Sequence, residues 1–122
     1  MPLSIGSGYM QPEVRKLLYD MLHAAMGIEM FVDGRSRDDL DADLMLRLAI
    51  ERQFEIIGEA MGRLRRIDVA TAEQISEHQR IIGLRNVLIH GYDVVSNDII
   101  WGIVQNKLPT LRRELEELLK SP

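Results

Sequence analysis

The sequence predicts an all-α fold, an antiparallel bundle of four long helices whose last helix is broken at Pro109. First, apolar residues recur at alternating spacings of three and four residues over long stretches, which is the period of an amphipathic helix. Second, no stretch shows the strict alternation of apolar and polar residues that is typical of a half-buried strand. Third, a length of 122 residues suits one domain with a single core.

The chain is expected to consist of a loose N-terminal arm, residues 1–10, and one helical domain, residues 11–122. The arm holds two glycines, two serines and a proline without any period. The first helix has Pro12 in its first turn and ends at Asp33-Gly34, because glycine often terminates a helix. Its apolar stripe is Val14, Leu18, Met21, Ala25, Ile28 and Val32.

The second helix follows a polar connector, residues 35–41, with Asp41 or Asp43 as its cap, and fades after Arg66. Gly58 and Gly62 lie four residues apart within it. Each costs up to about 1 kcal/mol relative to alanine in a helix interior, so we expect another backbone to approach closely there. That backbone belongs either to a helix of the same chain or to a second subunit.

The third helix carries the residues of chemical interest and ends at Gly91. Before it, Thr71–Gln74 has the residue types of a capping box and predicts a short turn. Ser96 is expected to cap the fourth helix, and Pro109 to break or kink it at residues 106–108.

Composition excludes several classes of function. No apolar run approaches the roughly 18 residues that span a bilayer, and the N-terminus lacks the pattern of a signal peptide. The absence of cysteine removes disulfides and thiol chemistry and fits a cytoplasmic protein. The sequence shows no metal-ligand spacing, P-loop or dinucleotide fingerprint, so we expect no metal and no cofactor.

The net charge of −4 argues against electrostatic binding of nucleic acid over the whole protein surface. Any RNA binding must therefore use a local basic patch, for which Arg63, Arg65 and Arg66 are candidates.

The segment Ile81–Tyr92 places Arg85, Asn86, His90 and Tyr92 among aliphatic residues that would bury it on most sides. Burying a guanidinium and an imidazole without partners costs several kcal/mol, so pairing, a cleft or a ligand must recover that cost. In a helix Asn86 and His90 share a face, where Asn86 could orient the imidazole. Arg85 lies about 140° of rotation away from His90.

Each of these residues has a functional and a structural interpretation. His90 can exchange a proton near neutral pH, or it can be a buried imidazole bonded to a carbonyl. Arg85 can stabilise a phosphoryl transition state, or it can form a structural ion pair with Glu55 or Glu59.

The spacing of Arg85, His90 and Tyr92 resembles the R-x4-H-x-Y signature of the HEPN superfamily. The wider match resembles the HepT-like branch and covers roughly Val14 to Leu119. It is carried by the segments 55–60 (Glu-Ile-Ile-Gly-Glu-Ala), 81–92, 99–101 and 108–109.

The resemblance implies a HEPN-like helical domain that acts as a metal-independent endoribonuclease toxin on RNA, with tRNA as the substrate class. It implies a composite site at the cleft of a homodimer, with Arg85 and His90 catalytic and Asn86 supporting. It also implies that a partner, a minimal nucleotidyltransferase antitoxin, silences the toxin by adenylylating Tyr92. Two alternatives stay open: a non-catalytic helical module that docks a minimal nucleotidyltransferase or binds nucleotide, and a dimerisation domain whose Arg85 and His90 are structural.

Overall fold

The computed structural model describes residues 9–91 and 95–122, and within these ranges all regular structure is α-helical. The all-α prediction is therefore confirmed. The expected arm, residues 1–10, lies largely outside the described residues.

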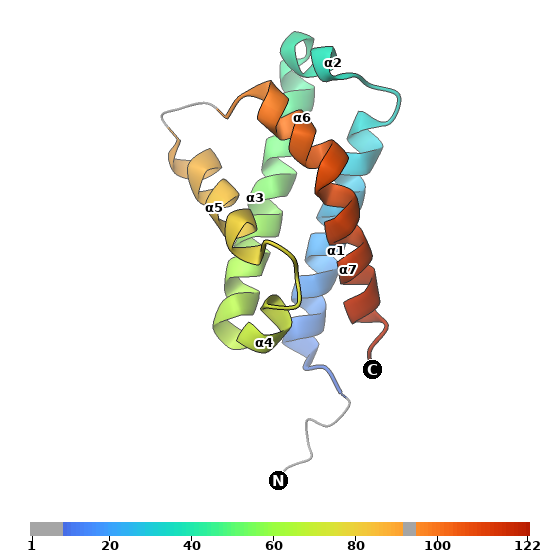
Figure 1. The fold of residues 1–122 in the computed structure, drawn as a ribbon, viewed down its shortest axis with the longest axis vertical. Helices are drawn as coiled ribbons and strands as arrows, with labels where there is room; N and C mark the ends of the chain where they lie inside the picture. Colours follow the sequence, from blue (N-terminus) through green and yellow to red (C-terminus); the bar gives the residue numbers. More distant parts are fainter. Residues whose placement is uncertain (1–8, 92–94) are drawn as a thin grey trace.

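The helices, in chain order, are α1 (Pro12–Val32), α2 (Arg37–Ala42), α3 (Leu44–Ile67), α4 (Val69–Ala72), α5 (His78–His90), α6 (Asn97–Asn106) and α7 (Leu108–Leu119). Figure 1 shows α1 and α5 running in one direction and α3 and α7 in the other. The central helix is α3, which packs against α1 on one side and α5 on another, while α7 packs against α1. None of the described helices is both long enough and apolar enough to cross a bilayer.

Several predicted helix ends are confirmed. The carboxylate of Asp43 accepts a hydrogen bond from the amide of Leu46 at 3.1 Å and begins α3. The hydroxyl of Ser96 accepts in the same way from the amide of Ile99 at the start of α6, at 3.2 Å. Pro109 lies in the first turn of α7, so the predicted break falls between α6 and α7.

Two predictions about the connections were wrong. Residues 37–42 form α2 instead of a connector, because Leu40 is buried and the Asp39 carboxylate accepts from the Ser36 amide at 2.7 Å. Thr71 is not a cap, because the Asp68 carboxylate accepts from its amide at 3.1 Å and from its hydroxyl at 2.6 Å. A carboxylate satisfies a helix N-terminus and also interacts favourably with its dipole.

The core lies between α1, α3, α6 and α7, and α5 contributes no buried side chain to it. This corrects the expectation that aliphatic residues bury α5 on most sides. The segment is instead a surface helix, with Ile81, Leu84 and Leu88 half-buried against the core and Val87 46% exposed. The candidate residues therefore sit on a helix with a large solvent-facing surface.

Candidate functional site

Two grooves flank α5. The first, of about 420 Å³, lies between α1, α3 and α5, and Arg85 and Ile89 form its α5 wall. The second, of about 550 Å³, lies between α5 and the α6–α7 side of the molecule, where Ile81 and Leu84 line it. Within the described residues, α5 therefore meets the body of the protein chiefly along α3.

A very close approach of α5 to α3 occurs at Gly58. A Cβ atom at this position would lie 2.2 Å from the Cβ of Arg85 and 3.1 Å from the carbonyl oxygen of Ile81. The expected close approach is confirmed at Gly58, and the neighbour is a helix of the same chain. At Gly62 no backbone from elsewhere in the described part of the same chain approaches, because the nearest atom is the Arg66 guanidinium at 3.7 Å, an ordinary contact, so the approach of a second subunit there stays a prediction.

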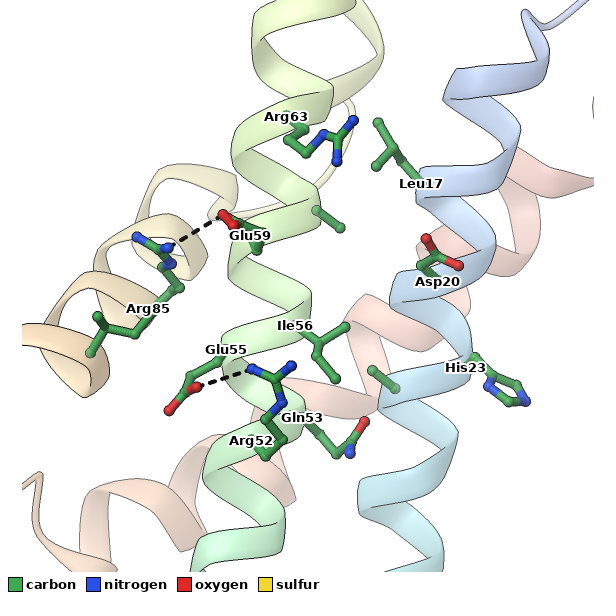
Figure 2. Close-up of a pocket in the computed structure, with 13 residues that line it drawn as sticks. Leu17, Asp20, His23, Arg52, Gln53, Glu55, Ile56, Glu59, Arg63 and Arg85 are labelled. Atoms are coloured by element: carbon green, nitrogen blue, oxygen red, sulfur yellow. Dashed lines mark hydrogen bonds and ion pairs between the residues drawn. The ribbon is translucent and has the colours of Figure 1, made fainter.

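Arg85 extends from this contact into the first groove (Figure 2). Its Nη2 donates to the Glu59 carboxylate at 3.3 Å, and its Nη1 donates to the Asn86 side-chain oxygen at 3.2 Å. Its Nε is buried and has no partner among the described residues. The structural interpretation expected an ion pair with Glu55 or Glu59, and the pair is with Glu59, while Glu55 pairs with Arg52. The side chain is 26% exposed, so a ligand in the groove can reach the guanidinium.

His90 is the last residue of α5 and is exposed. It does not line the groove that Arg85 enters, which agrees with the rotation of about 140° between the two positions on a helix. The hydrogen bond described for the exposed Asn86 side chain is to Arg85, not to His90. A single chain therefore presents the guanidinium and the imidazole on different sides of α5.

Tyr92 lies outside the described residues, so its assignment as a modification site stays a prediction.

The charges that line the first groove are balanced. Arg52, Arg63 and Arg85 are matched by Asp20, Glu55 and Glu59 (Figure 2). A phosphate entering this groove would therefore have to displace a carboxylate from its arginine. Among residues 9–91 and 95–122, no cluster of three or more histidine, aspartate or glutamate side chains could hold a metal ion.

The sequence interpretation missed Arg47, the buried charged residue at the start of α3. Its guanidinium contacts Glu51, Asn97 and the carbonyl of Val95. The signal was available, because Arg47 continues the apolar stripe of α3 at the spacing of three before Ile50. A charge at such a position predicts a buried pair.

Comparison with known proteins gives one family and several relatives. The family described as "Ribonuclease HepT-like" matches residues 21–118. A protein of Methanocaldococcus jannaschii, provisionally named an RNase, is 34% identical over 108 residues, 88% of both chains. A Caldanaerobacter subterraneus protein with the same provisional name is 34% identical over 89 residues, 73% of this chain and 79% of its own. A Thermococcus cleftensis protein, provisionally named ribonuclease HepT, is 29% identical over 103 residues, 84% of this chain and 93% of its own. No solved structure matches the chain significantly.

Proposed function

Because the chain belongs to the ribonuclease HepT-like family, the branch of the HEPN superfamily that its sequence resembles, we propose that it is an endoribonuclease. The active site is formed between two copies of the chain, with Arg85 supplied by one copy and His90 by the other. The observation that carries this proposal is the placement of both side chains on α5, an accessible surface helix, within the segment that the family match covers.

The need for two copies follows from the geometry of α5. Arg85 and His90 point to different sides of this helix, so one copy does not direct both at one phosphate. The outward face of α5 carries Val87, which is 46% exposed, and Gly83, where an added Cβ atom would have no neighbour within 4 Å. An isologous contact that covers this face and extends to the mouth of the first groove, where Arg85 lies, brings two copies of the segment together.

The reaction uses the 2′-hydroxyl of the RNA as its own nucleophile. His90 takes the proton of that hydroxyl as the bond from O2′ to phosphorus forms, and the imidazolium so formed donates that proton to O5′ as the bond from phosphorus to O5′ breaks. Arg85 leaves Glu59 and donates to the phosphoryl oxygens, where negative charge accumulates in the transition state. The products are a 2′,3′-cyclic phosphate and a 5′-hydroxyl, and DNA is inert because it lacks the 2′-hydroxyl. The reaction needs no metal ion to generate the nucleophile.

The family resemblance extends the proposal to a toxin that cleaves tRNA and is controlled by a nucleotidyltransferase antitoxin. The antitoxin transfers an adenylyl group from ATP to the hydroxyl of Tyr92, with release of pyrophosphate. Tyr92 follows His90 by two residues in the sequence, so adenylylation adds a negatively charged phosphodiester two residues after the proposed acid and base. Such a charge repels the phosphates of RNA.

A second candidate function is a non-catalytic helical module that docks a nucleotidyltransferase. The ion pair between Arg85 and Glu59 favours it, because Arg85 already has a partner within its own chain. In this case His90 is an exposed residue without a catalytic role.

Cleavage of total tRNA by His90→Ala, compared with wild type, decides between the two functions. The ribonuclease proposal predicts a loss of about a hundredfold or more, the usual contribution of a general acid or base. Gln79→Ala is the matched control, because Gln79 is also exposed on α5 but lies eleven residues before His90. Circular dichroism confirms that each variant is folded, and end-group analysis identifies the cyclic phosphate. Wild-type activity in folded His90→Ala refutes the ribonuclease proposal. Cleavage that a chelator abolishes refutes the metal-independent mechanism.

A further inference from the structure

Arg85 is fixed near its backbone, and its guanidinium is held by residues of the same chain. The absence of a side chain at Gly58 makes room for it: a Cβ atom there would lie 2.2 Å from the Cβ of Arg85 and 2.9 Å from its Cγ. Beyond Cγ, Nη1 donates to the Asn86 side chain at 3.2 Å and Nη2 donates to the Glu59 carboxylate at 3.3 Å. Figure 2 shows the guanidinium directed from α5 at Glu59 on α3. The guanidinium can therefore exchange partners by rotation about its last bonds, while the first carbons of the side chain stay in place.

The geometry of the pair between Arg85 and Glu59 indicates a weak interaction. A charge-assisted bond from nitrogen to oxygen is typically about 2.7–2.9 Å long, whereas this one is 3.3 Å. Only one nitrogen of the guanidinium contacts the carboxylate, and the buried Nε has no partner among the described residues. The Glu59 side chain is 57% exposed, so water competes for its oxygens. A better acceptor can therefore displace it from Arg85 at a small cost.

Glu59 is the one carboxylate within 4 Å of the Arg85 guanidinium in the described part of the chain. The other two carboxylates that line the first groove, Asp20 and Glu55, form ion pairs of 2.7 and 3.4 Å with cations of their own helices. A phosphate that binds Arg85 must therefore displace Glu59 and leave its negative charge without this partner, beside the phosphate. Two negative charges at such a short separation repel each other.

We propose that Glu59 competes with RNA for Arg85 and weakens substrate binding until a phosphate takes its place. A phosphodiester carries one negative charge, as the carboxylate does, and its two free oxygens suit the planar guanidinium better than the single contact at Glu59. The exchange couples release of the guanidinium to the arrival of the substrate. The inference rests on the proposed function, since it assigns to Glu59 the regulation of that same site.

The experiment compares Glu59→Gln with wild type in steady-state cleavage of total tRNA. Glutamine has the size of glutamate but no charge, so it holds the guanidinium less strongly and does not repel a phosphate. We expect KM to fall by about two- to fivefold, the usual strength of an exposed ion pair, while kcat does not fall. Glu55→Gln is the matched control, because it removes the same charge from the same groove at a residue that pairs with Arg52 instead of Arg85. Its KM should remain close to that of wild type.

Binding of intact tRNA provides a second measurement that does not depend on activity. It is made in the His90→Ala background, in which the proposed mechanism allows no cleavage, and is followed by fluorescence anisotropy. We expect Glu59→Gln to lower Kd by about the same two- to fivefold. Once Arg85 is also replaced by alanine, Glu59→Gln should lower Kd no more than Glu55→Gln does, because the carboxylate then withholds no guanidinium.

Three results overturn the inference: a Kd for tRNA that Glu59→Gln leaves unchanged, a gain that Glu55→Gln equals, and a gain that persists without Arg85. A fall in kcat in folded Glu59→Gln also overturns it, because that result assigns Glu59 the task of orienting Arg85 for the reaction. If Glu59→Gln does not fold, Glu59→Ala is judged by the same criteria. If the wild-type protein cleaves no RNA, the proposed function fails, while the tRNA binding still decides whether Glu59 competes for Arg85.

Discussion

Replacing Gly58 by alanine places a methyl carbon 2.2 Å from the Cβ of Arg85 and 3.1 Å from the carbonyl oxygen of Ile81. Ordinary contact begins at 3.4 Å, so the distance from Arg85 is short by 3.4 − 2.2 = 1.2 Å. Neither neighbouring atom can rotate away, because one is a Cβ and the other belongs to the main chain. The variant therefore forces α5 to move away from α3 by about 1 Å.

The expected change in stability has two parts. Alanine gains about 0.5–1 kcal/mol over glycine in a helix interior, whereas overpacking of this kind costs about 1–3 kcal/mol. The net destabilisation of Gly58→Ala is about 1–2 kcal/mol, which lowers Tm by roughly 3–8 °C for a chain of this size. Gly62→Ala is the matched control on the same helix: its nearest neighbour is at 3.7 Å, so it should gain about 0.5–1 kcal/mol.

Urea denaturation followed by circular dichroism measures both variants, and the difference between their free energies of unfolding removes the shared effect of helix propensity. RNA cleavage by Gly58→Ala, measured where the variant is folded, should fall further than the stability loss explains, because Arg85 moves with α5. If Gly58→Ala is as stable as Gly62→Ala, α5 does not approach α3 as described, and the reasoning fails.

Three further predictions concern the interface, the shared site and pH. Gly83→Ala should weaken dimerisation by about tenfold or more in a dilution series followed by light scattering, since its methyl group meets the second copy. Gly102→Ala is the control: this position is equally open within one chain, so the variant should dimerise like wild type. Mixing Arg85→Ala with His90→Ala, each inactive alone, should restore about a quarter of wild-type cleavage, because half of the dimers are mixed and each has one intact site; no recovery would contradict a site with one residue from each copy. A main-chain amide in the first turn of α3 donates to the Asp43 carboxylate and holds the pKa of Asp43 below its ordinary value of 3.8. The ionised carboxylate therefore stabilises the folded state above pH 3.8, and this contribution is lost as the pH falls through the lower pKa of the folded protein. Thermal unfolding from pH 6 to 2 should therefore show a smaller loss of stability in Asp43→Asn than in wild type, and equal losses would count against the assignment.

The elements were predictable where a local signal decides the structure. Asp43 and Ser96 cap helices because short polar side chains satisfy free amides, and Pro109 ends a helix because it cannot continue the hydrogen-bonded ladder. The short helix α2 was not predictable in the same way, because its stability depends on burial of Leu40 against distant parts of the chain. Sequence periodicity also overestimated the burial of α5, since aliphatic content does not show on how many sides a helix has neighbours.

The sequence predicted the angular separation of the candidate residues around α5 and one of their contacts. The separation of Arg85 and His90 follows from helix geometry alone, and of the two predicted partners of Arg85, Glu55 and Glu59, the structure selects Glu59. The distant partners of Arg47 could not be read from local sequence, because its acceptors at Val95 and Asn97 lie about fifty residues away. Long-range hydrogen bonds of this kind produce no periodic pattern in the sequence.

The attachment of α5 chiefly along one neighbouring helix has a consequence for how the protein loses activity on heating. A segment without a buried side chain can detach at a lower free-energy cost than the core needs to unfold, so opening is expected there first. Amide hydrogens of α5 should then exchange with solvent sooner than those of α1 or α3, and a protease should cut near α5 before the remainder. Heat inactivation would in this way precede the calorimetric transition, because the core between α1, α3, α6 and α7 would stay folded after α5 has detached with Arg85 and His90.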